Sequence, residues 1–420
     1  MKKALWLLAA LIVLLAAWAV LSWPREEYVA STSAAVTPAT LARGAYLARA
    51  GDCMACHTAR GGPAYAGGRS LQTPFGSIAA PNITPDRATG IGAWSADDFW
   101  RALHNGKSRD GRLLYPAFPY TNYTRVTRPD ADALFAYLQS VPAVRQANAP
   151  HQLRFPYNTQ AALAAWRLVY FKPAVFAAQP ARSAEWNRGA YLVEGLGHCS
   201  ACHSARNAAG AGDQSLGGGL IPVLNWYAPS LTSDAEAGLG SWAVPDIVDL
   251  LHTGISNRAT VFGPMAEVVG RSLQYLDKPD ITAMAVYLKS LPATPAQKRP
   301  VEQTGELAQV LERGKKSYET HCIDCHGADG KGLPPHYPPL AGNRALRMDS
   351  AVNPIRIVLN GGFAPGTAGN PRPYGMPPYS HLMNDTEVAA VVTYLRNSWG
   401  NQAPPVAARD VNRYRSTPVD

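Results

Sequence analysis

The sequence predicts an all-α protein of three similar small domains in series behind an apolar N-terminal segment. Two observations lead to this fold class: a block of sequence that occurs three times, and a helical spacing of apolar residues at the end of each copy. The chain has 420 residues, which is enough for several domains. Hydrophobic residues make up 47% of it and charged residues 16%, so each copy can bury an apolar core.

Each copy begins with a short segment that contains an Arg-Gly pair. Residues 43–47 and 188–192 both read Arg-Gly-Ala-Tyr-Leu, and the third copy has the pair at 313–314. Further along, the segment 80–84 recurs as 228–232. Because a repeat marks a unit of structure, we expect domains at residues 38–145, 183–294 and 300–400, with a linker at 146–182 and a tail at 401–420.

Each copy also ends with a predicted helix. We expect these helices at residues 129–141, 278–291 and 385–399, because apolar residues recur there three and four positions apart. The linker contains a further apolar stretch, residues 159–178, which predicts a helix that is either buried between domains or lies on a membrane surface.

The first residues of the chain, 1–24, predict a membrane anchor or signal segment. Lys2 and Lys3 precede an apolar run of about 20 residues, which is the length that spans a bilayer. The lysines favour the cytoplasmic side, so we expect the rest of the chain outside the cytoplasm. A cleaved signal peptide is the alternative, because residues 17–19 read Ala-Trp-Ala.

All six cysteines of the chain fall in three copies of the pattern C-x-x-C-H, which is the attachment signature of c-type haem. In such a site the two thiols bond the haem covalently and the histidine ligates the iron. A disulfide framework, a zinc site and a redox dithiol are alternatives, but three copies with no cysteine left over favour haem. The predicted residues are Cys53, Cys56 and His57, then Cys199, Cys202 and His203, then Cys322, Cys325 and His326.

A second axial ligand is expected for each iron, and methionine is the usual one in electron transfer. Only seven methionines are present. Met265 and Met376 follow the second and third motifs in glycine- and proline-rich loops, so we predict that both ligate iron. Met284 is expected in the core, and Met383 is a weaker candidate for the third site.

The first copy departs from this pattern because it has no methionine after Met54. Phe118 occupies the expected place in the loop 115–120, and a phenyl ring cannot ligate iron. The iron of the first haem is then five-coordinate, or bound by His104, or bound by a methionine from elsewhere. We favour a structural role for His104, because His252 holds the matching place in the second copy, where Met265 is available.

With these motifs the chain resembles the membrane-bound triheme cytochrome c subunits of bacterial periplasmic dehydrogenases for alcohols, gluconate, sorbitol and fructose. The C-x-x-C-H sites carry the resemblance, together with residues 73–76, 82–86, 115–120, 262–268 and 375–379. It implies three tandem cytochrome c-type domains with covalent haem, on the periplasmic side of the cell membrane. Family members have methionine where this chain has Phe118.

The resemblance also implies the partners. A separate catalytic subunit of the flavin, pyrroloquinoline quinone or molybdenum type oxidises the substrate, and the cytochrome passes the electrons to membrane ubiquinone. The chain is then an electron-transfer subunit and not an enzyme on its own.

Other functions are less consistent with the sequence. A peroxidase would need an open first haem with His104 as its acid–base group. A terminal-oxidase cytochrome subunit would leave the dehydrogenase-like motifs unexplained. The net charge of +9 comes without an arginine-rich run between aromatic residues, so no nucleic-acid partner is expected.

Overall fold

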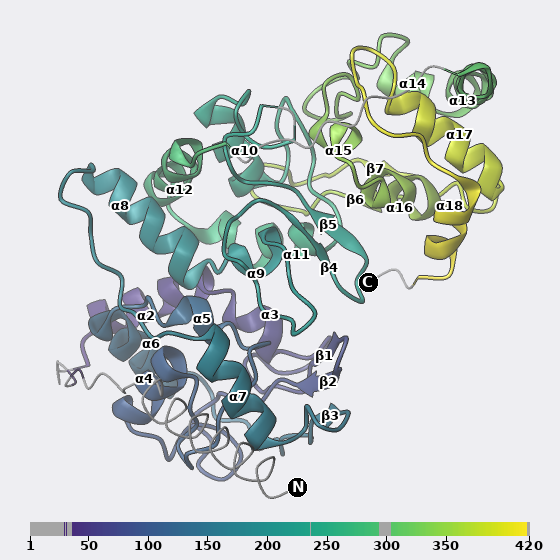
Figure 1. The fold of residues 1–420 in the computed structure, drawn as a ribbon. Coiled ribbons are helices and arrows are strands. Elements are labelled where there is room, and N and C mark those ends of the chain that lie inside the picture. The colour runs from purple at the N-terminus through teal and green to yellow at the C-terminus, as the bar shows by residue number, and fades with distance from the viewer. Residues whose placement is uncertain (1–28, 30, 32–35, 236, 294–303, 418–420) are drawn as a thin grey trace, which may run out of the picture. The chain divides into compact units, whose positions relative to one another are not determined.

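A computed structural model describes residues 29, 31, 36–235, 237–293 and 304–417 (Figure 1). The chain divides into two compact units, one of Met1–Ala45 with His57–Ala177 and one of Tyr46–Cys56 with Ala178–Asp420. The expected anchor or signal segment, residues 1–24, lies outside the described residues. Within the described residues, no helix combines the length and apolar character needed to span a bilayer.

The first unit holds the first repeat and the linker. Its elements are helices α2 (Pro38–Ala50) and α3 (Cys53–His57), whose residues are divided between the units, then β1 (Ser70–Thr73), β2 (Gly76–Ala79), α4 (Ala96–Asn105), α5 (Tyr120–Tyr123), α6 (Arg128–Ser140), β3 (Gln152–Leu153) and α7 (Gln160–Tyr170).

The second unit holds the second and third repeats. The second repeat has helix α8 (Ala184–Tyr191), the π-helix η1 (Leu192–Leu196), α9 (Ser200–His203), β4 (Gly219–Ile221), β5 (Trp226–Ala228), α10 (Val244–Thr253), α11 (Pro264–Arg271), the 3-10 helix η2 (Leu273–Tyr275) and α12 (Lys278–Ser290). The third repeat has α13 (Gly305–His321), α14 (Ile323–His326), α15 (Arg344–Arg347), α16 (Val352–Asn360), β6 (Gly362–Phe363), β7 (Gly375–Met376) and α17 (Asp385–Leu395). The predicted tail contains helix α18 (Ala408–Arg415).

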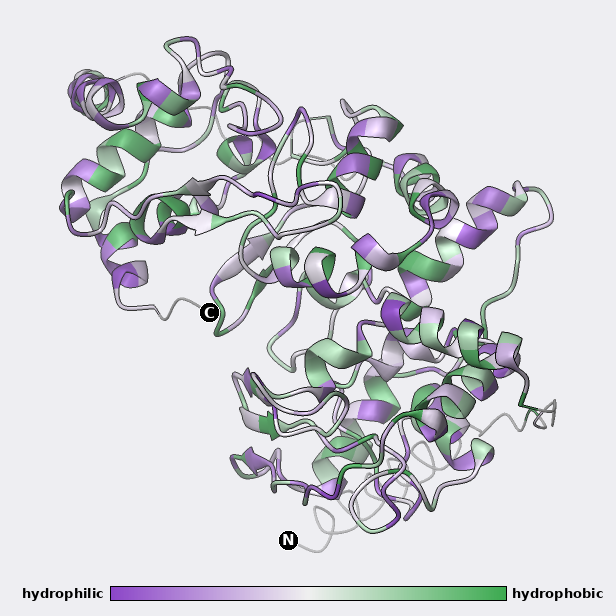
Figure 2. Cartoon of the chain, turned by 180° about the vertical axis from the view of Figure 1, so that it is seen from behind, coloured by the Kyte–Doolittle hydropathy of each residue, from purple (hydrophilic) through white to green (hydrophobic). Residues whose placement is uncertain are grey.

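The closing helices α6, α12 and α17 confirm the helices predicted from apolar spacing, within four residues at either end. Their apolar residues are buried, as Leu134, Leu288 and Val388 illustrate. Figure 2 shows hydrophobic and hydrophilic residues alternating around the helices, as expected for helices with one buried face.

The opening and closing helices of each repeat cross at a glycine. A Cβ added to Gly314 in α13 would lie 2.2 Å from the carbonyl oxygen of Ala390 in α17. Gly44 and Gly189 have the same relation to the carbonyls of Ala133 and Ala283. No side chain fits in this space, which is why the Arg-Gly pair recurs at the start of every repeat.

An ion pair between a partly exposed arginine and a buried or largely buried aspartate accompanies the crossing in the first two repeats. The Nε of Arg43 donates to Asp130 at 2.6 Å, and the Nε of Arg188 donates to Asp280 at 2.8 Å. Both aspartates lie in the first turn of a closing helix, where a carboxylate also favours the helix dipole. The arginine and glycine of the repeated pair therefore fix the same two helices together.

The end of α2 belongs to the second unit because its side chains bond there. The hydroxyl of Tyr46 donates to Asp280 at 2.6 Å, and the hydroxyl of Ser272 donates to the carbonyl of Arg49 at 2.6 Å. The guanidinium of Arg49 lies 4.3 Å from the ring centroid of Tyr275. The sequence repeat and the packing units therefore have different boundaries.

The expectation of an all-α fold is wrong, because the described residues contain three small antiparallel sheets. The strand orders are β1-β2-β3, β4-β5 and β6-β7. In the first sheet Thr73 pairs with Gly76 across a two-residue turn, and the Thr73 hydroxyl donates to the Gly76 carbonyl. These strands have two to four residues, which is too short for an alternation of apolar and polar residues to be recognised.

Helix α7 occupies part of the predicted apolar stretch and ends at Tyr170. Leu163, Arg167 and Phe171 are buried against the first unit, and the Arg167 guanidinium lies 5.2 Å from the ring centroid of Tyr120. Val169 is 58% exposed. One side of α7 therefore packs within the first unit.

We expect Gly314→Ala to loosen the third repeat. The added methyl would overlap the Ala390 carbonyl, and overpacking of this kind costs about 1–3 kcal/mol or more. Hydrogen exchange followed by mass spectrometry should show faster exchange in α13 and α17 and no change in α8 and α12.

Gly305→Ala is the matched control in the same helix, because a Cβ at Gly305 meets no atom within 4 Å. It should leave the exchange of α13 unchanged or slower. Equal exchange in the two variants would contradict the role given to the crossing.

Candidate functional site

The three C-x-x-C-H motifs contain the short helices α3, α9 and α14, which follow the opening helix of each repeat, in the second repeat after the π-helix η1. In each motif the histidine Nδ1 hydrogen-bonds the carbonyl of a proline. A carbonyl can only accept, so Nδ1 carries the proton and Nε2 keeps its lone pair for a metal. The distances are 2.7 Å for His57 and Pro81, 2.7 Å for His203 and Pro229, and 3.1 Å for His326 and Pro338.

The surroundings keep these histidines neutral. Burial lowers the pKa of His57 and His326, and it lowers the pKa of His203 to about 4. A neutral imidazole with a fixed tautomer is the form that binds iron. The histidines are therefore prepared as ligands by the protein alone.

The cysteines are poorly suited to a zinc or dithiol site. Burial raises the pKa of Cys53, Cys199 and Cys322 to about 12, whereas zinc ligands and redox dithiols need an accessible thiolate. Among the described residues, no three histidine, cysteine or acidic side chains form a group that could hold a metal ion. Covalent attachment through both thiols agrees with these surroundings.

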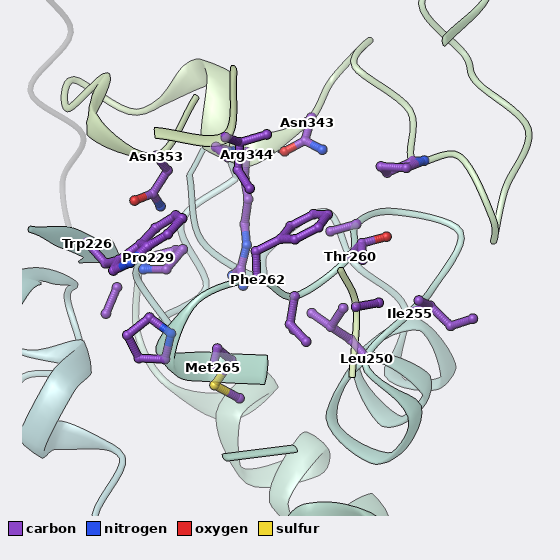
Figure 3. A pocket seen from close by; sticks show the side chains of 18 of the residues that line it. Trp226, Pro229, Leu250, Ile255, Thr260, Phe262, Met265, Asn343, Arg344 and Asn353 are labelled. Carbon is purple, nitrogen blue, oxygen red and sulfur yellow. Dashed lines mark hydrogen bonds between the residues drawn. The ribbon is translucent and has the colours of Figure 1, made fainter. Parts of the chain in front are cut away.

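The second unit contains a cavity of about 350 Å³ that is lined by both of its motifs (Figure 3). Its walls are mostly apolar, as a haem requires. The structure brings together in this cavity the residues predicted for the second site, namely Cys199, Cys202, His203 and Met265, and those predicted for the third, namely Cys322, Cys325, His326 and Met376.

The two candidate methionines are held in defined backbone. Met265 lies in the first turn of α11, and Met376 ends strand β7, where it pairs with Gly362 of β6. Met284 and Met383 are almost fully buried, at 2% and 4% exposure, and Met383 belongs to the core of the third repeat. Met284 also borders the cavity, from helix α12.

Two polar atoms of the cavity wall fit the acidic edge of a haem. The Trp226 Nε1 and the Thr260 Oγ1 are buried and have no hydrogen-bond partner among the described residues. A buried donor without a partner is costly, so such donors mark a place for a polar ligand. A haem carries two propionates that can accept these hydrogen bonds.

The second motif also contacts the segment before the first motif. The His198 ring donates a hydrogen bond to the Gly51 backbone, but burial has the larger effect and lowers the His198 pKa. Ala50 and Asp52 line the same cavity as Cys199. The attachment loops of the first and second repeats therefore adjoin within the second unit.

In the first repeat, the loop 115–120 places Phe118 beside Tyr123, with ring centroids 5.3 Å apart. His104 is fully buried, stacked on Trp100 with ring centroids 4.6 Å apart. Its Nδ1 bonds the Thr124 carbonyl at 2.8 Å. The full burial and the stacking on Trp100 favour a structural role for His104.

The matching histidine of the second repeat has a different environment. His252 lies at the same place in α10 but is only partly buried. The two histidines therefore share a position in their helices and differ in packing.

Sequence reasoning missed two features of these sites. The proline carbonyls that hold the histidines were visible as the recurrence of 80–84 in 228–232, but the recurrence did not reveal a role. Arg344, which also lines the cavity, comes from the third repeat, and no spacing rule connects it with the second motif.

Motif helices with oriented histidines, in a fold of crossed opening and closing helices, define a c-type cytochrome. The family model described as Cytochrome c matches residues 41–142 and 311–399. These stretches include the first and third motifs, whereas the second lies between them.

Three relatives cover nearly the whole chain. The cytochrome c subunit of alcohol dehydrogenase (quinone) from Gluconacetobacter polyoxogenes is 38% identical over 93% of this chain and 88% of its own length. The gluconate 2-dehydrogenase cytochrome c subunit of Pantoea cypripedii is 42% identical over 90% of both chains. The fructose dehydrogenase cytochrome subunit of Gluconobacter japonicus is 35% identical over 96% of this chain and 88% of its own.

The chain therefore belongs to the family of cytochrome c subunits of bacterial dehydrogenases, as the sequence motifs predict. It is an electron-transfer subunit with covalent c-type haem, not the catalytic subunit of its complex.

We expect His104→Ala to destabilise the first unit and leave the haem spectra unchanged. Truncation of a large buried side chain costs roughly 2–4 kcal/mol, and the Trp100 stacking and the Thr124 bond are lost with it. Thermal unfolding would measure the stability, and electron paramagnetic resonance the spin state of each haem.

His252→Ala is the control, and its partly buried position predicts a smaller loss of stability. If His104→Ala instead removes a low-spin signal, His104 is an iron ligand and the structural role is wrong.

Proposed function

We propose that the chain carries three covalent c-type haems, one on each C-x-x-C-H motif. His57, His203 and His326 serve as proximal ligands, and Met265 and Met376 complete the second and third sites. When bound, each haem iron accepts and releases one electron. The observation that carries this proposal is the shared cavity, whose wall includes both cysteines, the histidine and the methionine of two motifs.

The protein's own residues set the properties of these sites. The proline carbonyls orient the histidines, and the apolar walls exclude water and favour the less charged ferrous state. Met265 and Met376 supply neutral thioether donors, which raise the potential further. The second and third sites are therefore suited to accept electrons at high potential.

We propose that the iron of the first haem has no methionine ligand. Phe118 replaces it in the loop, and His104 is fully buried with its ring stacked on Trp100. The same contacts argue against His104 as the acid–base group of a peroxidase. This haem should have a lower potential than the other two.

The proposed electron route begins at a catalytic dehydrogenase subunit and ends at membrane ubiquinone. The relatives are named as subunits of alcohol dehydrogenase (quinone), gluconate 2-dehydrogenase and fructose dehydrogenase, which supports a partner of this kind. The partner's substrate is an alcohol, sugar, sugar acid or related compound, and its cofactor is of the flavin, pyrroloquinoline quinone or molybdenum type.

We further propose that the chain works on the periplasmic side of a bacterial cell membrane. Lys2 and Lys3 followed by an apolar run support export. The haems would then be attached to the motifs on the periplasmic side of the membrane.

Ligation can be tested by substitution at the three expected ligand positions, with Met284 as the control. Met265→Ala and Met376→Ala should each convert one low-spin haem to high-spin, whereas Met284→Ala should convert none, because Met284 belongs to the core. Phe118→Met should do the opposite at the first haem, giving a third low-spin signal and one raised midpoint potential.

Haem content is measured on the same samples as the pyridine haemochrome, with three haems per chain expected. A ratio near two would contradict the three-site proposal. Three low-spin haems in the unaltered protein would contradict an open first site.

The electron-transfer role is tested on the chain purified with its native partner. Addition of the partner's substrate should reduce the haems, and a soluble ubiquinone analogue should reoxidise them. The isolated chain with substrate alone is the control and should stay oxidised. Reduction without the catalytic subunit would mean that the chain is itself an enzyme.

A further inference from the structure

Arg344 belongs to the third repeat but extends into the wall of the second site. It begins helix α15, and Figure 3 shows its side chain entering the cavity between Trp226 and Phe262. Its Nη1 donates to the Ser230 carbonyl at 3.2 Å, and its guanidinium lies 5.0 Å from the ring centroid of Trp242. Both contacts are with the second repeat.

The guanidinium has no carboxylate partner in the described part of the chain. Burial lowers the Arg344 pKa to about 10, so the group remains a cation at neutral pH. Asp52 is the one carboxylate among the described cavity residues, and no ion pair joins it to Arg344. A desolvated cation without an anion is costly, so an anionic ligand is expected beside it.

Two further donors converge on the same cavity. The Trp226 Nε1 and the Thr260 Oγ1 are buried without partners among the described residues. In Figure 3 Trp226 lies beside Arg344, and Thr260 lies beyond Phe262 in the same cavity wall. The Trp226 ring is fixed by the guanidinium of Arg356, which lies 4.7 Å from its centroid. A cation and two neutral donors in a mostly apolar wall form a site for a carboxylate.

The second and third repeats are bonded so that Arg344 keeps this position. Asn353 exchanges two hydrogen bonds with the backbone of Tyr227, at 2.9 and 2.8 Å. The Thr367 hydroxyl donates to the Thr253 carbonyl at 2.9 Å. These bonds hold the third repeat against both sides of the second site.

We propose that Arg344, Trp226 and Thr260 bind a propionate of the haem on the second motif, so that the third repeat completes the second site. This inference rests on the proposed haem at Cys199 and Cys202. The positive charge of Arg344 neutralises the negative charge of the propionate. The propionate then stabilises the extra positive charge of ferric iron less, and Arg344 itself repels that charge in the low-dielectric cavity. It thereby raises the potential of the second haem.

The test is a redox titration of Arg344→Gln in the full haem-loaded protein. The second haem is identified as the one that becomes high-spin in Met265→Ala. Its reduction equilibrium should fall about tenfold, which is 59 mV for one electron. The potential should also become dependent on pH near neutrality, because the propionate loses its cation and its pKa rises. The other two potentials should not move.

Arg347→Gln is the matched control, because Arg347 lies in the same helix and outside the cavity wall. Arg344→Lys keeps the charge and should restore most of the potential. Trp226→Phe and Thr260→Val each remove one donor and should lower the same potential by less.

If the Arg344→Gln protein no longer contains the second haem, the redox titration is done on Arg344→Lys and Thr260→Val instead. Thr260→Val should then lower the potential of the second haem, and Arg344→Lys should keep most of it. Unchanged potentials with three haems retained would overturn this inference alone. An effect of Arg344→Gln that neither Trp226→Phe nor Thr260→Val shares would overturn propionate binding. Two haems per chain in the unaltered protein would overturn the proposed function instead.

Discussion

The close crossing of the opening and closing helices is the constraint on which each repeat depends. At Gly44, Gly189 and Gly314 the backbone of one helix touches a carbonyl of the other, so that a single methyl would separate them. The motif helix follows soon after the opening helix, in the second repeat after η1, so the crossing also sets where the cysteines and the histidine begin. The angle of two helices thereby determines the position of a cofactor several residues away.

The loops that follow each motif helix complete the site with backbone carbonyl groups. A proline carbonyl bonds each histidine, and a carbonyl presented by proline is well placed because the ring restricts the local conformation. Side chains then decide how the sites differ. The second and third sites have a methionine in the wall, whereas the first repeat has Phe118 in its loop. One scaffold can therefore hold irons of unequal potential.

Much of this could be predicted from the sequence, and the failures have physical causes. The motifs and the closing helices were predictable because covalent chemistry needs a fixed spacing and a buried helix face needs a fixed period. The strands β1 to β7 were missed because two to four residues are too few to show a period. Arg344 was missed because its role depends on how two repeats pack, and the local sequence around it contains only a short helix.

The sharing of α2 between two units bears on how such a protein arose. A block of sequence that occurs three times suggests duplication, after which each copy could have remained a separate module. Tyr46 and Arg49 instead bond Asp280 and Tyr275, residues of the second copy. A domain cut out at the sequence boundary would lose these partners and leave polar groups unsatisfied. The copies are thus no longer interchangeable. A change in one copy must remain compatible with its contacts in the other, so natural selection acts on the chain as a whole.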